Sequence, residues 1–226
     1  MSSRRDVFIE NGIYHIFNKT IDKKRIFASD AHSGEFIARL NYYRSSAVVV
    51  RYSRYKTLPS EIKAQHEEKI SAPSTFVYEI ICYCLMPNHF HLLVRQKKGG
   101  SITSYMSNVV NSFTRYINLL TKRNGPLFLP QFQSRMMVND EQFLHTTRYI
   151  HLNPYSSKVV GSMKELMEYR FSSYAAYVAR KSDQTVDKIT LSASMDGDME
   201  RYRKFVEDHA EHQRMREWLK HTEKWK

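Results

Sequence analysis

Residues 82–94 constrain the fold most, because they form two apolar strands joined by a tight turn, CYCLMPNHFHLLV. Side chains along a strand alternate between two faces, so His89 and His91 point to the same side and Phe90 points to the other. Phe90 and the run 92–94 hold this strand in the core. Two imidazoles on one face of a rigid strand supply half of a metal site. The alternative interpretation is a pair of surface histidines on an edge strand.

The chain of 226 residues carries a net charge of +12. A cation excess of this size predicts a polyanionic partner, most often a nucleic acid. A membrane surface is the rival partner, but no stretch is long and apolar enough to span a bilayer, and the N-terminus lacks a signal-peptide core. Cys82 and Cys84 lie two residues apart on one strand, which is poor geometry for a disulfide and suits a reducing compartment. We therefore expect a cytoplasmic protein with no membrane partner.

Helices and strands are mixed along the chain, with the hairpin in the middle. This order predicts an α+β domain, with an antiparallel sheet packed by helices in a ferredoxin-like or RRM-like layer. Asp30 and Asn139–Asp140 are expected to cap helices, and Pro154 is expected to end one. The expected elements are strands at 13–18, 76–85, 89–96 and 132–138, and helices at 30–43, 102–117, 140–153 and 199–220.

A second group of reactive side chains lies in residues 147–154, TRYIHLNP. On a helix, Tyr149 and Asn153 are four residues apart and share a face. A phenol is a poor nucleophile at neutral pH, but it can attack a phosphodiester when a divalent cation stabilises the developing charge. His89, His91 and Asn153 would supply three ligands and leave positions open for phosphate and water. Alternatively, Tyr149 is a core aromatic residue and Asn153 only a helix-end residue before proline.

Five short motifs occur in a fixed order: YHIFN at 14–18, LMPNHFHLLV at 85–94, GPLF at 125–128, YIHLNP at 149–154 and FSSY at 171–174. Together they resemble the single-tyrosine HUH transposases (IS200-like), particularly the REP-associated tyrosine transposase branch. The resemblance implies an HUH nuclease domain over residues 1–178, with a possible insertion near 45–75. A basic helical C-terminal extension would then occupy residues 179–226.

The resemblance also implies roles for individual residues. His89 and His91 would bind a divalent metal, Mg²⁺ or Mn²⁺, and Tyr149 would attack single-stranded DNA. Asn153 would be the third ligand, where related enzymes place a glutamine. The implied activity is nicking and strand transfer: a 5′-phosphotyrosine forms, and a 3′-hydroxyl then rejoins the strand.

The implied partner is single-stranded DNA with hairpin-forming repeats, bound by a monomer or a homodimer. No nucleotide cofactor is expected, and the chain has no G-x-x-x-x-G-K-[ST] phosphate loop. Basic residues beside aromatic ones are the usual means of binding single strands. The candidate DNA-binding residues are Arg4, Arg5, Lys19, Lys23, Lys24, Arg25, Arg115, Lys122, Arg123 and Arg135.

Three alternatives remain open on the residues alone. Tyr116 is a rival nucleophile, although its neighbours suggest a packing role. Cys82 and Cys84 could complete a four-ligand zinc site with the two histidines. A three-residue turn would place Tyr83 opposite His91 and the thiols on the other face.

The third alternative is functional. A domesticated protein could keep the fold and bind hairpin DNA or RNA without cutting it. His151 lies two residues from Tyr149 and is expected outside the metal ligands, where it could touch DNA.

Overall fold

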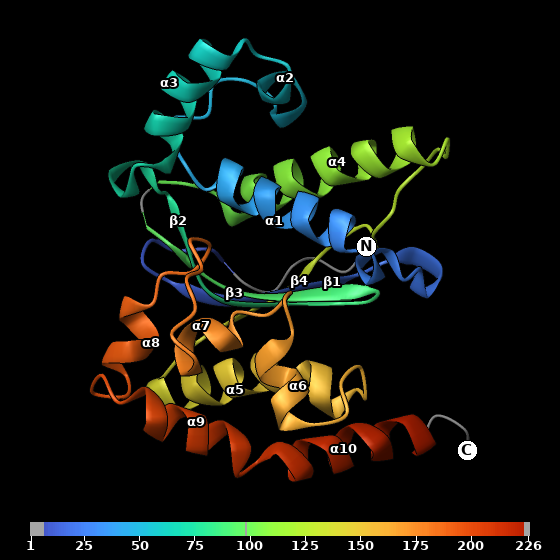
Figure 1. The fold of residues 1–226 in the computed structure, drawn as a ribbon, viewed down its shortest axis with the longest axis vertical. Coiled ribbons are helices and arrows are strands. Elements are labelled where there is room, and N and C mark those ends of the chain that lie inside the picture. Colours follow the sequence, from blue (N-terminus) through green and yellow to red (C-terminus); the bar gives the residue numbers. More distant parts are fainter. Residues whose placement is uncertain (1–6, 98, 224–226) are drawn as a thin grey trace.

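The computed structural model describes residues 7–97 and 99–223. A four-stranded sheet with the order β2-β3-β1-β4 forms its centre, and every neighbouring pair is antiparallel. Together with helices α1 and α4, which connect the strands, this order is the β-α-β-β-α-β arrangement of ferredoxin-like folds. The expected α+β class is therefore confirmed (Figure 1). The strands are β1 (Ile13–Lys19), β2 (Tyr78–Met86), β3 (His89–Gln96) and β4 (Gln133–Met136).

Helices cover both faces of the sheet. Helices α1 (Asp30–Tyr43) and α4 (Ile102–Leu120) lie on one face, and α5 (Asp140–Ser156) lies on the other (Figure 1). The alternation of β3 explains this, because Phe90, Leu92 and Val94 are buried in a core with α1 and α4. Leu93, between them, is buried in a second core with α5. A strand with apolar residues on both faces needs cover on both faces.

The β2–β3 hairpin differs from the expected register. Met86 pairs with His89 and Cys84 pairs with His91, so only two residues form the loop. The prediction of a three-residue turn, with Tyr83 opposite His91, is wrong. A loop shorter by one residue shifts the pairing by one, and every side chain of β2 then changes sides relative to β3. The thiols therefore share a face with His91.

Helix ends follow local capping, with small departures from expectation. Ser29, not Asp30, caps α1, and its hydroxyl accepts from the His32 amide at 3.4 Å. Asn139 caps α5 as expected, with its side-chain oxygen 2.8 Å from the Gln142 amide. Pro154 lies inside the last turn of α5 and does not end it, since the helix continues to Ser156. Near a C-terminus, proline removes only one of the last amide donors.

The segment between α1 and β2 forms a small helical unit above α1 (Figure 1). It contains α2 (Tyr52–Lys56), α3 (Ser60–Ser71) and a 3₁₀ turn at Pro73–Thr75. The rings of Tyr42, Tyr52 and Tyr55 form its core with Ile70. The segment that the sequence marks as an excursion is thus ordered, and its aromatic side chains attach it to the end of α1.

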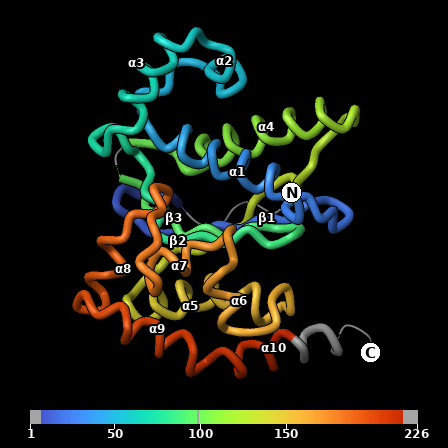
Figure 2. The backbone as a smooth tube through the Cα atoms, in the orientation of Figure 1, coloured from blue at the N-terminus to red at the C-terminus, as the bar shows by residue number. Residues whose placement is uncertain are grey.

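The C-terminal helices pack under the second face of the sheet. Helices α9 (Met199–Glu207) and α10 (Ala210–Glu223) run along α5 (Figure 2). Tyr202 and Val206 are fully buried in the same core as Ile150 of α5. The remaining short helices are α6 (Met163–Glu168), α7 (Tyr174–Val178), α8 (Ile189–Ala193) and the 3₁₀ turns Ile21–Lys23 and Ile26–Ala28. No helix within the described residues is long and apolar enough to cross a membrane.

The burial of Tyr202 predicts that α9 belongs to the cooperative core. We expect Tyr202→Ala to lower the free energy of unfolding by about 3–5 kcal/mol, because it removes a buried ring and leaves a cavity. Urea denaturation measures the change. Lys204→Ala, an exposed change on the same helix, should stay within about 0.5 kcal/mol. Equal effects of the two substitutions would show that α9 lies outside the core.

Candidate metal and tyrosine site

His91 and Tyr149 meet between the sheet and α5. The Tyr149 ring stands edge-on to His91, with the ring centroids 5.5 Å apart. His89 lies two residues before His91 on β3, and its ring centroid is 5.1 Å from that of His91. His91 is buried, whereas His89 and Tyr149 are half-buried. The structure therefore brings the phenol and the histidine pair to one place, although β3 and α5 are far apart in sequence.

A third histidine, His15 of β1, joins this group and was not anticipated. Its Nε2 atom lies 2.9 Å from Nδ1 of His91, and both side chains are buried. Alternation along residues 14–18 places His15 and Phe17 on one face of β1. That pattern was readable from the sequence, but which strand lies beside β1 was not. The strand pairing alone brings His15 to His91.

Hydrogen bonds to the imidazole rings select which nitrogen atoms remain free. His89 Nδ1 lies 2.7 Å from Asn88 Oδ1, an acceptor, so Nδ1 carries the proton. In the tautomer of His91 that likewise carries its proton on Nδ1, this Nδ1–H donates to His15 Nε2. Both rings then present an unprotonated Nε2 atom. Metal-binding histidines typically donate the other ring N–H in this way.

Burial keeps these rings neutral. It lowers the pKa of His89 to about 4, with the positive charge of Lys19 acting in the same direction. It also lowers the pKa of His15 to about 4, helped by Arg135. The pKa of His91 lies well below its ordinary value, first because of burial and then because of the neighbouring histidines. Neutral imidazole is the form that binds a metal ion.

Asn153 lies on the same helix face as Tyr149 and is buried. Its Nδ2 atom donates to the Tyr149 carbonyl at 3.0 Å, which leaves Oδ1 as the atom able to bind a cation. Within the described ranges, no group of three or more His, Cys, Asp or Glu side chains is arranged to hold a metal ion. The two histidines therefore fit a divalent cation only if the Asn153 oxygen, phosphate or water completes its shell.

The cysteines form no thiolate site with the histidines. Cys82 and Cys84 are fully buried, and burial raises the pKa of both thiols. Cys84 Sγ makes its hydrogen bond to Met86 Sδ, at 3.7 Å. Protonated thiols are poor zinc ligands.

The C-terminal helix reaches the same site. Gln213 of α10 donates its Nε2 to the Tyr149 carbonyl at 3.2 Å. Burial raises the pKa of Tyr149, and the negative charge of Glu217 raises it further. Sequence reasoning missed this contact, because nothing in a polar amphipathic helix identifies the face on which it packs.

Two of the expected DNA-binding cations flank the site. Lys19 pairs with His89 across β1 and β3, and Arg135 pairs with His15 across β1 and β4. Paired residues point to the same face, so both cations lie beside the histidines. Their side chains are exposed and available to a phosphate.

The other expected cations lie elsewhere. Lys23, Lys24 and Arg25 are exposed in the turns after β1. Arg115 and Lys122 lie on and just after α4, across the sheet from the histidines. Arg123 holds the end of α4, donating to Asn118 Oδ1 at 2.8 Å and to the Pro126 carbonyl at 3.1 Å. Arg4 and Arg5 lie outside the described residues.

Tyr116 and His151 have structural surroundings. Tyr116 lies on α4, beyond the sheet from His91, with the Arg39 guanidinium 4.9 Å from its ring centroid. His151 is fully buried, and its ring nitrogens bond Tyr202 at 2.7 Å and Ser173 at 2.9 Å. The interpretation that His151 could touch DNA is therefore wrong, because its face of α5 packs on α7 and α9.

A comparison with protein families identifies the chain. The sequence model described as IS200-like transposase matches residues 39–153, just over half of the chain. The chain belongs to the IS200-like transposase family. The family expected from the motifs is thus confirmed, and membership places this transposase among DNA-processing enzymes.

One solved structure supports the fold of this transposase, and a second is more distantly similar. A REP-associated tyrosine transposase bound to a REP hairpin matches with a TM-score of 0.55 and 17% identity, over 83% of this chain and 92% of that one. A protein from Deinococcus radiodurans R1, named as a transposase, matches with a TM-score of 0.35 and 13% identity, over 66% of this chain and 95% of that one. No curated protein matches the transposase significantly.

The hydrogen bond between His91 and His15 predicts a positioning role for His15. We expect His15→Ala to weaken Mn²⁺ binding by about 10–100-fold, because the His91 ring loses the partner that fixes its tautomer and orientation. Isothermal titration calorimetry with MnCl₂ measures the affinity. His91→Ala should abolish binding, and His212→Ala, an exposed change on α10, should leave it unchanged. Wild-type affinity in His15→Ala would refute the role.

Proposed function

We propose that the chain is a metal-dependent transposase that cleaves and rejoins single-stranded DNA, with Tyr149 as nucleophile. The observation that carries the proposal is the edge-on contact between Tyr149 and His91, at 5.5 Å, on a sheet face that also holds His89. Family membership supports the reaction class, because transposases break and join phosphodiesters.

His89 Nε2, His91 Nε2 and Asn153 Oδ1 are the atoms that would hold a divalent cation. Mn²⁺ and Mg²⁺ both suit a site of imidazole and amide ligands that handles phosphate. When bound, such a cation polarises a phosphoryl oxygen and stabilises the charge that develops on it. Lys19 and Arg135, exposed on either side, would contact the flanking phosphates.

The Tyr149 phenol stays protonated at neutral pH, because the ordinary pKa of a phenol is about 10 and burial raises the pKa of Tyr149 further. Attack forms a bond between the phenolic oxygen and phosphorus and breaks the bond to the 3′-oxygen. The phenol loses its proton, and the leaving 3′-oxygen gains one. A second 3′-hydroxyl then attacks the 5′-phosphotyrosine, which restores the phosphodiester and the free phenol. The covalent linkage retains the phosphodiester's energy, so the cycle uses no nucleotide cofactor.

Hairpin-forming repeats are the substrate we propose. The REP-associated transposase with the same fold is bound to such a hairpin. The net charge of +12 suits a DNA partner in general. A protein that binds hairpins without cutting them is the alternative, and covalent chemistry separates the two.

The proposal predicts a covalent adduct that depends on one tyrosine. Wild type should give a protein–DNA band on a denaturing gel with labelled hairpin-bearing single strands and Mn²⁺, but none with EDTA. Tyr149→Phe should abolish the band, because it removes the attacking oxygen. Tyr116→Phe is the matched control and should retain it.

Two results would count against the proposal. Loss of the band only in Tyr116→Phe would show that the nucleophile is Tyr116 of α4 and not Tyr149. Tight hairpin binding without any adduct would favour the silent binding protein.

A further inference from the structure

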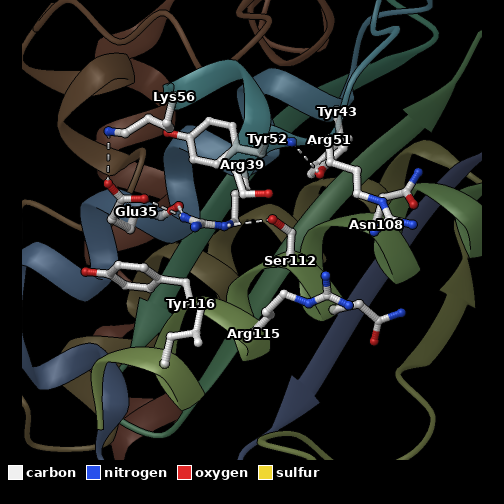
Figure 3. Close-up of a pocket in the computed structure, with 13 residues that line it drawn as sticks. Glu35, Arg39, Tyr43, Arg51, Tyr52, Lys56, Asn108, Ser112, Arg115 and Tyr116 are labelled. Carbon is white, nitrogen blue, oxygen red and sulfur yellow. Dashed lines mark hydrogen bonds and ion pairs between the residues drawn. The ribbon is translucent and has the colours of Figure 1, made fainter. Parts of the chain in front are cut away.

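A groove runs along the outer side of α4, on the sheet face away from Tyr149. Its central part has a volume of about 450 Å³ and lies between α1, α2 and α4 (Figure 3). Neighbouring depressions of about 620 Å³ and about 730 Å³ extend it along the helix. They share Arg51 and Asn108 with the central part at one end, and Asn111 and Arg115 at the other. The three depressions therefore form one continuous surface.

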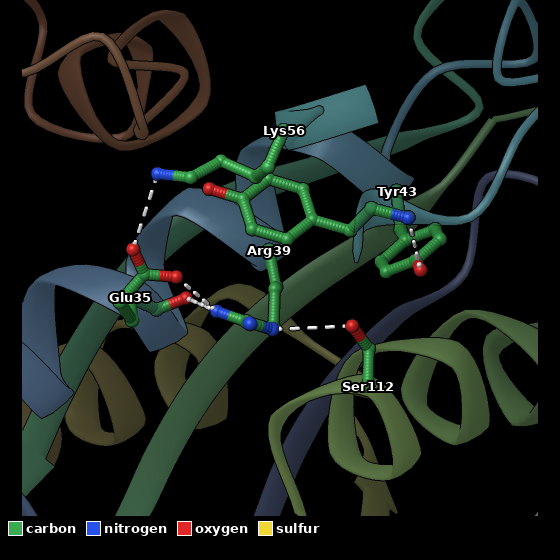
Figure 4. A network of polar contacts seen from close by, with 6 residues as sticks. Glu35, Arg39, Tyr43, Lys56 and Ser112 are labelled. Carbon is green, nitrogen blue, oxygen red and sulfur yellow. Dashed lines mark hydrogen bonds and ion pairs between the residues drawn. The ribbon is translucent and has the colours of Figure 1, made fainter. Parts of the chain in front are cut away.

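The single carboxylate of the central part, Glu35, is already neutralised. Arg39 Nη1 lies 2.6 Å from Glu35 Oε2, and Lys56 Nζ lies 3.4 Å from Oε1 (Figure 4). Arg39 also donates its Nε to Ser112 Oγ at 3.1 Å and lies over the Tyr52 ring at 4.5 Å. Arg39 is therefore part of the wall, and Glu35 adds no unpaired negative charge.

Three other cations of the groove have no such partner. The side chains of Arg51, Arg115 and Lys122 are exposed, and within the described residues none of the three makes a hydrogen bond or an ion pair. Arg115 is the only charged residue of α4. Asn108 lies on the same wall (Figure 3), and Asn111 of the same helix also lines the groove. Arginine, lysine and amide side chains are among the groups that contact DNA phosphates.

The inserted segment holds the second wall in place. The Tyr52 amide donates to Tyr43 Oη at 3.1 Å, and the Tyr42 ring packs edge-on against Tyr52 at 5.2 Å. These contacts position Arg51, which precedes α2, opposite α4. The wall is thus built before any ligand binds, which lowers the entropic cost of binding.

We propose that this groove binds the sugar–phosphate backbone of the DNA substrate, outside the phosphodiester that is cut. The inference rests on the proposed function, because that function supplies the DNA. From Asn108 to Leu119 the helix rises about 16 Å. One strand of a duplex stem carries a phosphate about every 3.4 Å of helix axis, so a groove of this length can contact more than one phosphate of a strand. The sheet separates it from the histidines, so one DNA molecule would contact both faces.

The test compares the full-length wild type with the double variant Arg51→Ala, Arg115→Ala. The probes are a fluorescent hairpin oligonucleotide from repeats that flank the gene and a polythymidine strand, followed by anisotropy over a range of salt concentrations. We expect the variant to bind both probes about tenfold more weakly or worse. The slope of log affinity against log salt should fall by about 1.4–1.8, because two phosphate contacts are lost.

Arg54→Ala, Lys69→Ala is the matched control. It removes two exposed cations from the same inserted segment, and neither lines the groove. We expect wild-type affinity and slope. Equal losses in both double variants would show that only net charge matters and would overturn the proposal. Displacement of the probe by thymidine monophosphate at equal nucleotide concentration would assign the groove to a free nucleotide and also overturn it.

The covalent-adduct assay on wild type separates this inference from the proposed function. An adduct with wild type, together with unchanged binding by the Arg51→Ala, Arg115→Ala variant, would contradict DNA binding by the groove but support the proposed cleavage reaction. Weaker binding by this variant without any wild-type adduct would support DNA binding by the groove but contradict the cleavage reaction.

Discussion

The structure depends on the position of β3 in the middle of the molecule. It has a strand on each side and a helical layer on each face, so every one of its side chains meets a partner. Phe90, Leu92 and Val94 hold α1 and α4, while Leu93 and His91 face α5. The same alternation that builds two cores thus places an imidazole in the interior, where only hydrogen bonding can offset its desolvation.

The need to hydrogen-bond buried histidines links the stability of the fold to the arrangement of the candidate site. His91 satisfies Nδ1 through His15, and in the tautomer whose Nδ1–H donates, the bond leaves Nε2 available to a cation. His151 uses both ring nitrogens to join α5 to Tyr202 and to Ser173. Because His151 lies two residues from Tyr149, the bonds that dock the C-terminal helices also hold the phenol against the sheet. His91 is thus hydrogen-bonded within the sheet, and His151 positions a helix.

In our proposal, each face of the sheet contacts a different part of the DNA. The α5 face carries the phenol, the histidines and flanking cations, so it would act on one phosphodiester. The α4 face carries a groove lined by amides and by the unpaired arginines Arg51 and Arg115, so it would hold the backbone elsewhere. The inserted segment between α1 and β2 contributes Arg51, and its tyrosine core keeps that arginine in place.

The sequence by itself determined the alternation of β3, and with it the shared face of His89 and His91. It also determined the periodicity of α4, the Asn139 cap of α5 and the family motifs. These features are local, since each depends on residues a few positions apart. The expected roles of the site residues remain predictions.

Only the tertiary structure decided the hairpin register, the neighbour of His91 and the docking of α10. A loop one residue shorter moved Cys84 opposite His91, and no local pattern specifies loop length to one residue. His15 reaches His91 because β1 pairs with β3. Pairing between distant strands, and the face on which an amphipathic helix packs, depend on the whole chain folding together.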